Sequence, residues 1–350
     1  MGDLRVGVTG PTGEIGRSLV RALDRSKDVG RIVGMARRPF DPGAEGLKKV
    51  EYRRGDILDR ASVDSLAADV DVLVHLAFII FGDKAESRRI NLQGSRNVFE
   101  AALEAGVERL VYTSSVAAYG FHDDNPDWLT EDIEPRGSDE HHYSAQKAEV
   151  EELLANLASA TGRSTGVYIF RPCIVAGPNA LMLIKKIPYV SIGRKLPDGA
   201  RKVVGALPLL RPVLPDPGVP FQLVHHDDVA SAMVAGVLGS GQPGPYNLAA
   251  NGEITISDLA HALGWYAVPV AELLLDATAK IVSTLPLMPV EARWINALTV
   301  PVLADCERAR VQLGWKPKHD ALETLSQTVA AARAQGLLSA KEKSLAAGTT

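Results

Sequence analysis

The sequence predicts an α/β protein with a doubly wound parallel sheet and a smaller, mostly helical C-terminal part. Two observations support this fold class. Short apolar runs alternate with helical patterns through about the first 170 residues, and the first run leads into a stretch with three glycines before the first helix. Apolar strands that alternate with helices are typical of a parallel sheet covered by helices on both faces.

The expected elements follow one another in a regular order. Gly106 is expected to end the helix before it, because glycine readily adopts the left-handed conformation of a C-cap. This order predicts a Rossmann-type domain. Strands are expected at 4–10, 31–36, 50–56, 71–77, 108–115 and 165–170, and helices at about 14–25, 62–68, 84–106 and 141–161.

The pattern changes after Pro178. Residues 188–220 are rich in proline and cannot form one long helix, and a loop of this length is usually functional or mobile. Residues 221–238 resemble a strand, a turn and a helix. Further helices are expected at about 256–264, 269–284 and 319–334. We therefore expect a Rossmann-type domain at 1–178, to which about 221–240 return, a smaller domain at 179–220 and 241–334, and a frayed tail at 335–350.

Three glycines separate the first strand from the first helix. Gly10, Gly13 and Gly16 would allow a tight turn, a close approach to a pyrophosphate, and close contact between helix and strand. The helix N-terminus would then face the phosphates. A glycine pattern alone could be an ordinary turn, but its place between strand and helix favours a dinucleotide site. Thr12 and Ile15 in the same loop are further candidates for cofactor binding.

Charge at the end of the second strand bears on the choice of dinucleotide. An acidic residue there would bind the adenosine ribose of NAD, but the chain has Arg37 and Arg38 instead. Guanidinium groups suit a 2′-phosphate, so NADP is preferred and NAD stays possible; the alternative is that both arginines are solvated surface charges. Asp56, followed by Ile57, could accept a hydrogen bond from adenine or cap a helix.

A serine, a tyrosine and a lysine form the candidate catalytic group. Ser115 ends the fifth strand, and Tyr143 and Lys147 are four residues apart, so they share one face of a helix. A nearby ammonium would stabilise a phenolate and make the tyrosine a better acid–base group, while the serine hydroxyl would hold a substrate oxygen. Such a group performs proton transfer together with hydride transfer and needs no metal.

Together these motifs resemble those of the extended short-chain dehydrogenases/reductases of the NAD-dependent epimerase/dehydratase type. The resemblance implies that Leu76, Ala77 and Asn91 lie along the cofactor and that Pro172 and Ile174 lie at its nicotinamide end. It also implies a C-terminal substrate-binding domain and a homodimer formed through the helices at 84–106 and 141–161. The motifs that carry it are TGPTGEIG, GDILD, VHLAF, NLQGSRNVFEAA, YTSSVAAYG, YSAQK, FRPCIVAGP, VHHDDVASA, YNLA and LGWKP.

Other polar clusters have simpler interpretations. The run from His225 to Asp228 suggests a metal, but no third ligand stands at a typical spacing, so we expect Asp227 or Asp228 to cap a helix and no metal to be bound. His141 and His142 are expected to face solvent or cap a helix, although one could line the mouth of the pocket. Cys173 is expected to be a small buried residue rather than a nucleophile.

The composition of the chain indicates which partners it binds and which cellular compartment it occupies. A net charge of −4 gives no basic surface for nucleic acid, and the longest apolar run, 72–81, is too short to cross a bilayer. Two distant cysteines exclude a disulfide scaffold and fit a reducing cytoplasm. The strand-like start leaves no room for a signal peptide. We expect a cytoplasmic protein that acts on a small molecule and binds neither nucleic acid nor membrane.

The substrate is suggested by the segments around 180–222. Residues 180–192 are apolar apart from Lys185 and Lys186, and proline and apolar residues surround Arg211. This favours an apolar alcohol or ketone, or a secondary-metabolite intermediate, over a UDP-sugar, although these lysines and the arginines 194, 201 and 211 keep a phosphorylated substrate open. The alternatives are a sugar-nucleotide epimerase or dehydratase that retains its cofactor, and a dinucleotide sensor without turnover.

Overall fold

Most of the expected elements are present in the computed structural model, which describes residues 2–162, 164–187, 189–190, 212–269 and 300–338. Its strands are β1 (Leu4–Thr9), β2 (Val29–Ala36), β3 (Val50–Arg54), β4 (Val72–His75), β5 (Arg109–Thr113), β6 (Gly166–Pro172), β7 (Ile174–Ala176), β8 (Val213–Asp216), β9 (Leu223–His225), β10 (Gly244–Leu248) and β11 (Tyr266–Pro269). Its helices are α1 (Glu14–Arg25), α2 (Arg60–Ala67), α3 (Lys84–Arg88), α4 (Gly94–Ala105), α5 (His142–Thr161), α6 (Met182–Lys185), α9 (His226–Val237), α10 (Ile256–Leu263), α12 (Glu307–Gln312) and α13 (Ala321–Ala334), with a π-helical turn η1 (Arg89–Gln93) and a 3₁₀ turn η2 (Val116–Tyr119).

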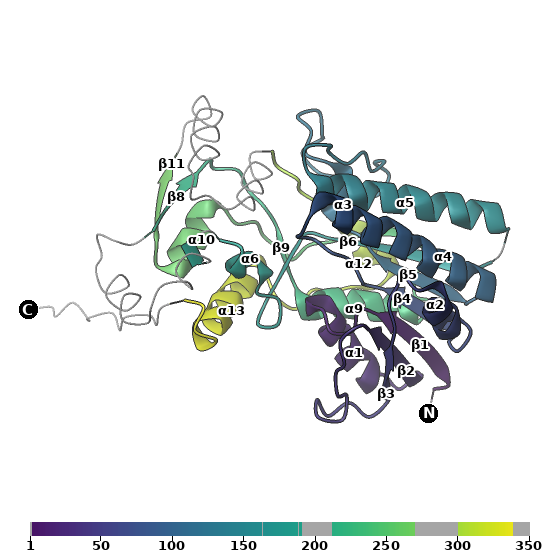
Figure 1. The fold of residues 1–350 in the computed structure, drawn as a ribbon. Helices are drawn as coiled ribbons and strands as arrows, with labels where there is room; N and C mark the ends of the chain where they lie inside the picture. Colours follow the sequence, from purple (N-terminus) through teal and green to yellow (C-terminus); the bar gives the residue numbers. More distant parts are fainter. Residues whose placement is uncertain (1, 163, 188, 191–211, 270–299, 339–350) are drawn as a thin grey trace, which may run out of the picture.

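Seven strands form one sheet in the order β10-β6-β5-β4-β1-β2-β3, and every neighbouring pair is parallel. The direction of strand order reverses between β1 and β4, so the loops after these strands leave the same sheet edge in opposite directions. In open α/β sheets, this point is where ligands bind. The doubly wound, Rossmann-type fold predicted from the sequence is confirmed (Figure 1).

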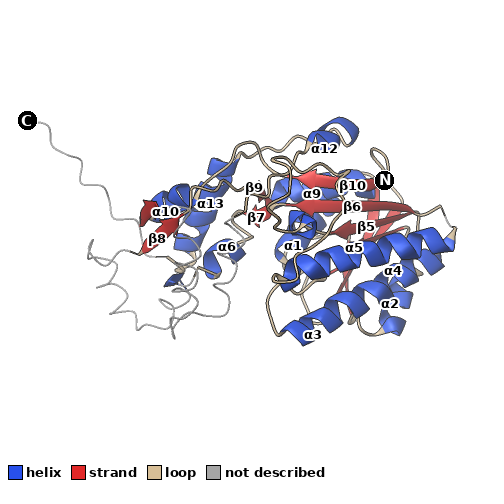
Figure 2. Ribbon diagram, turned by 90° about the horizontal axis from the view of Figure 1, so that it is seen from above, coloured by secondary structure: helices blue, strands red, loops and turns tan. Residues whose placement is uncertain are grey.

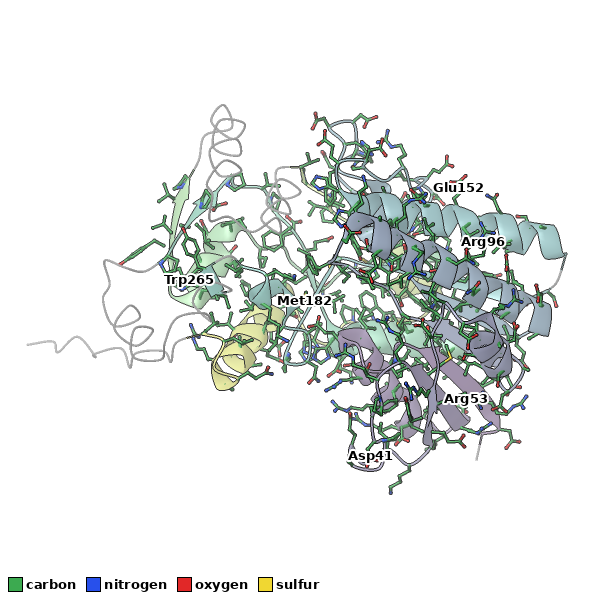
Figure 3. The ribbon with its side chains drawn as sticks, in the orientation of Figure 1. Asp41, Arg53, Arg96, Glu152, Met182 and Trp265 are labelled. Carbon is green, nitrogen blue, oxygen red and sulfur yellow. The ribbon has the colours of Figure 1, made fainter. Side chains whose placement is uncertain are left out.

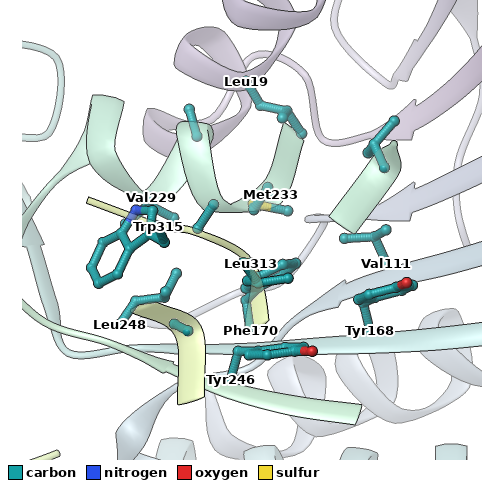
Figure 4. Close-up of a cluster of buried hydrophobic side chains, with 14 of the residues drawn as sticks. Leu19, Val111, Tyr168, Phe170, Val229, Met233, Tyr246, Leu248, Leu313 and Trp315 are labelled. Carbon is teal, nitrogen blue, oxygen red and sulfur yellow. The ribbon is translucent and has the colours of Figure 1, made fainter. Parts of the chain in front are cut away.

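Helices cover both faces of the sheet (Figure 1). α1 and α9 pack together on one face, while α2, α4 and α5 lie side by side on the other. Buried side chains fill each layer: Leu19 of α1 and Met233 of α9 belong to the core on the first face, which Figure 4 shows, and Phe99 of α4 and Leu154 of α5 belong to the core on the second. Burial of this apolar surface on both faces stabilises the sheet.

A smaller lobe lies beyond the carboxyl edge of the sheet, with the short pair β7–β9 between the two parts (Figure 2). It contains α6, α10, α13 and a two-stranded parallel sheet of β8 and β11, around its own cluster of buried residues. Figure 3 labels Met182 of α6 and Trp265, which belong to this lobe, and Arg53 of the large sheet. The glycine loop belongs to the large domain, and the smaller lobe is the expected substrate-binding part. The active site is therefore expected where the two lobes meet.

The structure corrects three expectations. Residues 244–248 form the edge strand of the large sheet, so they do not belong to the smaller domain, to which the sequence assigned 179–220 and 241–334. The expected helix at 84–106 is divided by the π-helical turn, although Gly106 ends it in the left-handed conformation as predicted. Part of 188–220 is a strand, β8. The expected helix at 269–284, the arginines 194, 201 and 211, and most of the tail lie outside the described residues.

Two further observations concern the cysteines and the length of the helices. Cys173 and Cys306 are both buried free thiols, as expected for a protein without a disulfide framework. Within the described ranges, no helix has the combined length and hydrophobicity needed to cross a bilayer.

Candidate active site

The glycine loop joins β1 to α1 beside the end of β4. Gly10 has φ +74°, and a Cβ on it would lie 2.9 Å from the backbone nitrogen of Ala77. A Cβ on Gly16 would overlap the carbonyl oxygen of Gly10. Gly13 differs, because it has φ −73° and its Cβ would meet an ordinary contact at 3.4 Å. Gly10 and Gly16 are therefore required by the fold itself, whereas a Cβ on Gly13, at the N-terminus of α1, would make only an ordinary contact.

Other candidate cofactor residues follow the ends of β2 and β3. Arg37 and Arg38 are exposed after the end of β2, and neither makes an ion pair within the described part of the chain. The Asp56 carboxylate accepts a hydrogen bond from the backbone nitrogen of Leu58 at 3.0 Å. Asp59, and not Asp56, stands at the N-cap of α2, so the helix-cap interpretation of Asp56 was wrong. Ile57 is buried.

A buried histidine ties the end of β4 to the glycine loop. The Thr9 hydroxyl lies 2.7 Å from His75 Nδ1, and the Ser95 hydroxyl lies 3.0 Å from Nε2. Burial lowers the pKa of His75 to about 3, so its ring is neutral at pH 7. Thr9 also accepts from the backbone nitrogen of Leu76. Leu76 and Ala77 thus lie next to Gly10, as expected for the turn along the cofactor.

Ser115 and Tyr143 meet at the carboxyl edge of the sheet. Ser115 follows β5, and its hydroxyl donates to the carbonyl oxygen of Pro172, at the end of β6, over 3.4 Å. Burial raises the pKa of the Tyr143 phenol, and a hydrogen bond with Ser115 opposes that rise. Ile174 begins β7 just beyond Pro172. The predicted serine, tyrosine and nicotinamide-end residues are therefore brought together.

Lys147 is buried one turn after Tyr143. Its Nζ donates to the carbonyl oxygen of Thr113 at 2.8 Å and to the Tyr112 hydroxyl at 3.3 Å, and it lies 5.9 Å from the centre of the Tyr143 ring. Burial lowers the pKa of Lys147 to about 7, while the charge of Glu151 acts in the opposite direction. The amine therefore exchanges its proton near neutral pH, in the range useful for acid–base chemistry.

Asn91 holds the loop after β4 in place. Its side-chain amide accepts from the backbone nitrogen of Ile79 at 2.8 Å and donates to the carbonyl oxygen of the same residue at 2.9 Å. The amide also donates to Gln146 on α5 at 2.7 Å. Asn91 lies in the π-helical turn and is fully buried, so it positions the turn beside the candidate site.

The histidine–aspartate run caps and joins chain segments. The helix cap of α9 is His225, whose Nδ1 accepts from the backbone nitrogen of Asp227, so the expected aspartate cap was wrong. Both oxygens of Asp228 accept backbone hydrogen bonds, from Lys318 and His319. The ring of His319 stacks on that of His225 with 3.9 Å between centres. His225, Asp228 and His319 lie close enough together to hold a metal ion. Their hydrogen bonds and ring contacts already join β9, α9 and the segment before α13.

Residues that the sequence did not identify as functional include His75, Phe78 and Glu14. Backbone groups of Leu181 and Met182, in the smaller lobe, make hydrogen bonds that lower the pKa of Glu14, although its burial raises it more. Glu14 therefore links the glycine loop to the second lobe. The only hint in the sequence was its place inside the loop. His141 stands at the N-cap position of α5, but its side chain makes no capping hydrogen bond and is half-buried against the ring of Phe121, so the expected solvent-facing or capping role was wrong. His142 is the first residue of α5.

The site can be compared with known proteins. The model of the "NAD dependent epimerase/dehydratase family" matches residues 6–249. Sterol demethylase protein B of Methylococcus capsulatus is 33% identical over 177 residues, which are 49% of this chain and 51% of that protein. An Escherichia coli O157:H7 enzyme, N-acetyl-alpha-D-glucosaminyl-diphospho-ditrans,octacis-undecaprenol 4-epimerase, is 32% identical over 141 residues, 38% of this chain and 41% of that protein. The alignments thus span about half or less of these relatives.

A solved structure supports the fold. MoeE5 in complex with UDP-glucuronic acid and NAD superposes with a TM-score of 0.66 and 22% identity, covering 95% of this chain and 99% of that one. The family match covers the glycine loop, Ser115, Tyr143 and Lys147. The chain therefore belongs to the NAD-dependent epimerase/dehydratase family of extended short-chain dehydrogenase/reductase enzymes.

Proposed function

We propose that this protein is an NAD(P)-dependent oxidoreductase that interconverts a carbonyl group and an alcohol on an apolar substrate. The observation that carries the proposal is the convergence of Ser115, Tyr143 and Lys147 at the edge of the sheet where the strand order reverses. Proton transfer to one oxygen, together with stabilisation of its charge, is what these three groups can do together.

The residues present fit a dinucleotide. The loop at Gly13, the N-terminus of α1 and the turn at Leu76 and Ala77 would hold its phosphates and backbone. Arg37 and Arg38 would bind a 2′-phosphate, so we propose NADP as the preferred form. When bound, the dinucleotide supplies or accepts the hydride.

The proton path runs through Tyr143. The phenol would donate its proton to the carbonyl oxygen in reduction and take it back in oxidation, while the Ser115 hydroxyl donates a hydrogen bond to the same oxygen. Lys147 would stabilise the phenolate, because its ammonium lies near the ring and little water screens the charges in this buried site.

An apolar substrate is supported by the loop that follows β4. Phe78, Ile79, Ile80 and Phe81 follow the cofactor turn in sequence, and the side chain of Ile80 is 41% exposed. The Phe78 ring contacts that of Tyr143, so this run adds apolar surface next to the candidate proton donor, which favours an apolar ligand. The similarity to a protein named for sterol demethylation also supports this substrate class.

A sugar-nucleotide epimerase or dehydratase is the second candidate. It is favoured by the similarity to an epimerase and to a structure solved with UDP-glucuronic acid, and by Lys185 on α6. Such an enzyme would keep its dinucleotide through the cycle. A dinucleotide sensor without turnover is the third candidate, and the presence of all three candidate catalytic residues argues against it.

One experiment separates these candidates. The purified protein is first analysed by mass spectrometry for retained dinucleotide and is then assayed at the reduced-nicotinamide absorbance band with apolar ketones, sterol ketones and UDP-sugars. Net oxidation of added NADPH by a ketone supports the oxidoreductase. A retained oxidised dinucleotide with conversion of a UDP-sugar supports the epimerase. Absence of turnover on every class supports the sensor.

The role of Tyr143 is tested by Tyr143→Phe, with Tyr266→Phe as the matched control on an exposed tyrosine. We expect loss of turnover by about 100-fold or more in the first variant, with dinucleotide affinity unchanged, because only the proton donor is removed. Full activity of Tyr143→Phe would contradict the mechanism.

We also propose a homodimer formed through α4 and α5. These helices lie side by side on the outside of the large domain, and Figure 3 labels the exposed residues Arg96 and Glu152 on them. Light scattering coupled to size exclusion should give the mass of two chains, and Glu152→Arg should shift it toward one chain. A monomeric wild type would contradict this assembly.

A further inference from the structure

The turn after β4 brings an aromatic ring onto the buried lysine. The centre of the Phe78 ring lies 3.6 Å from Lys147 Nζ, closer than the ring of Tyr112 at 5.0 Å or that of Tyr143 at 5.9 Å. The same Phe78 ring stands edge-on to Tyr143, with 5.7 Å between ring centres and 87° between planes. One side chain therefore touches both the candidate proton donor and its electrostatic partner.

The backbone fixes this ring from both sides. Before Phe78, Thr9 on β1 accepts hydrogen bonds from the backbone of Leu76 and, more weakly, Ala77. After Phe78, the amide of Asn91 bonds both backbone groups of Ile79. Because the residues on either side are held, the place of the ring does not depend on its own contacts alone. The arrangement is typical of a site prepared before its ligand arrives.

The charge of Lys147 has few other partners. Of the titratable groups around it, Glu151 on α5 is engaged by Arg171, His75 on β4 is neutral, and Tyr112 on β5 and Tyr143 on α5 are phenols whose pKa is raised by burial. No carboxylate pairs with Lys147 within the described ranges, and its hydrogen bonds go to a carbonyl oxygen and a hydroxyl. The face of an aromatic ring attracts a cation, most strongly where water is excluded.

We propose that Phe78 is a positioning residue of the candidate site, whose ring face holds Lys147 in place and favours its charged form inside the protein. The meaning of this role for catalysis rests on the proposed function, because the charge of Lys147 matters only if Tyr143 transfers a proton. The contact between the Phe78 ring and Lys147 does not rest on the proposed function, because it can be measured without substrate or dinucleotide. Its failure and the failure of the proposed oxidoreductase are therefore distinguishable.

The test is a direct titration of Lys147 by NMR. The full chain, freed of dinucleotide, is labelled with ¹³C at the lysine Cε, and the Lys147 signal is assigned by its loss in Lys147→Arg. Phe78→Leu keeps an apolar side chain but removes the aromatic face, so we expect the pKa of Lys147 to fall by about one unit. Phe81→Leu is the matched control, because Phe81 lies in the same loop with its ring over Lys186 instead. It should leave the Lys147 titration unchanged.

A second series keeps the result interpretable if Phe78→Leu does not fold. Phenylalanine with one, two or three ring fluorines at position 78 weakens the negative face of the ring stepwise with little change in volume. The pKa of Lys147 should fall in the same order. An unchanged pKa across the series, or a rise in Phe78→Leu, would overturn the proposal, since the ring would then act only as apolar cover.

Discussion

The Glu151 carboxylate and the Arg171 guanidinium form an ion pair in the interior of the protein, with 2.6 Å between Oε2 and Nη2 and side chains only 6% and 4% exposed. Glu151 follows Tyr143 and Lys147 at intervals of four residues on α5, so all three lie on one side of the helix. Arg171 lies in β6, directly before Pro172. The pair therefore fixes the helix that carries the candidate proton donor to the strand that ends at the site.

Breaking this pair should destabilise the protein strongly. Glu151→Gln removes the carboxylate and leaves the Arg171 guanidinium with only the neutral Tyr119 hydroxyl, at 2.8 Å, and an amide. Removing one partner of a buried pair costs about 3–5 kcal/mol in the free energy of unfolding, because the other charge stays buried. Urea unfolding followed by circular dichroism measures the loss.

An exposed ion pair provides the control for this measurement. Asp124→Asn breaks the pair that Asp124 makes with Arg136 on the surface, and it should change the free energy of unfolding little, because water screens an exposed pair. The double variant Glu151→Leu with Arg171→Leu should recover part of the loss seen in Glu151→Gln, because no unpaired charge is left. Equal, small losses for Glu151→Gln and Asp124→Asn would contradict the structural role of the buried pair.

His75 should make folding stability depend on pH in the acid range. Its pKa is about 3 in the folded protein and about 6.5 when the chain is unfolded, so only the unfolded chain takes up this proton between those values. The folded pKa is lowered, which means that the contribution is fully present above pH 6.5 and is lost as the pH falls from 6.5 to 3. One such proton gives a slope of about 1.4 kcal/mol per pH unit.

The contribution can be isolated with His75→Gln. This variant should be less stable than wild type at pH 7, because it loses well-formed hydrogen bonds to Thr9 and Ser95. Its free energy of unfolding should, however, fall less steeply between pH 6.5 and 3. Urea midpoints at a series of pH values give both slopes, and identical slopes would show that His75 takes up its proton alike in both states.

Arg37 and Arg38 should determine the preference for NADP. Replacing both with alanine removes the guanidinium groups that are expected to bind a 2′-phosphate, so the Kd for NADPH should rise about ten-fold or more. The Kd for NADH should change little. Tryptophan fluorescence titration measures both constants, and Arg96→Ala, an exposed arginine on α4, is the control. Equal affinity of the wild type for the two dinucleotides would refute the preference.

Much of the fold and of the candidate site could be predicted from residues that lie close together in the sequence. The glycine loop and the tyrosine–lysine spacing were recognisable because each depends on a few neighbouring residues, and the alternation of strands and helices indicated the sheet. Phe78 over Lys147 and His225 as a helix cap were not recognisable, because they depend on how distant segments meet. The strand at 244–248 was missed as part of the large sheet, since its short sequence, GPYNL, does not show which strand it pairs with.

Two glycines of the loop, Gly13 and Gly16, should respond differently to the same substitution. In Gly16→Ala the new methyl group would overlap the Gly10 carbonyl oxygen and the backbone of Pro11, so the loop has to shift, and we expect a loss of about 1–3 kcal/mol in the free energy of unfolding. In Gly13→Ala the methyl group meets no atom closer than 3.4 Å, so stability should change by less than about 1 kcal/mol. The same methyl group stands in the space proposed for the phosphates, however, so Gly13→Ala should weaken NADPH binding while the protein stays folded. Thermal unfolding and fluorescence titration of the two variants separate the effects. A Gly13→Ala variant that binds NADPH as tightly as wild type would place the phosphates elsewhere.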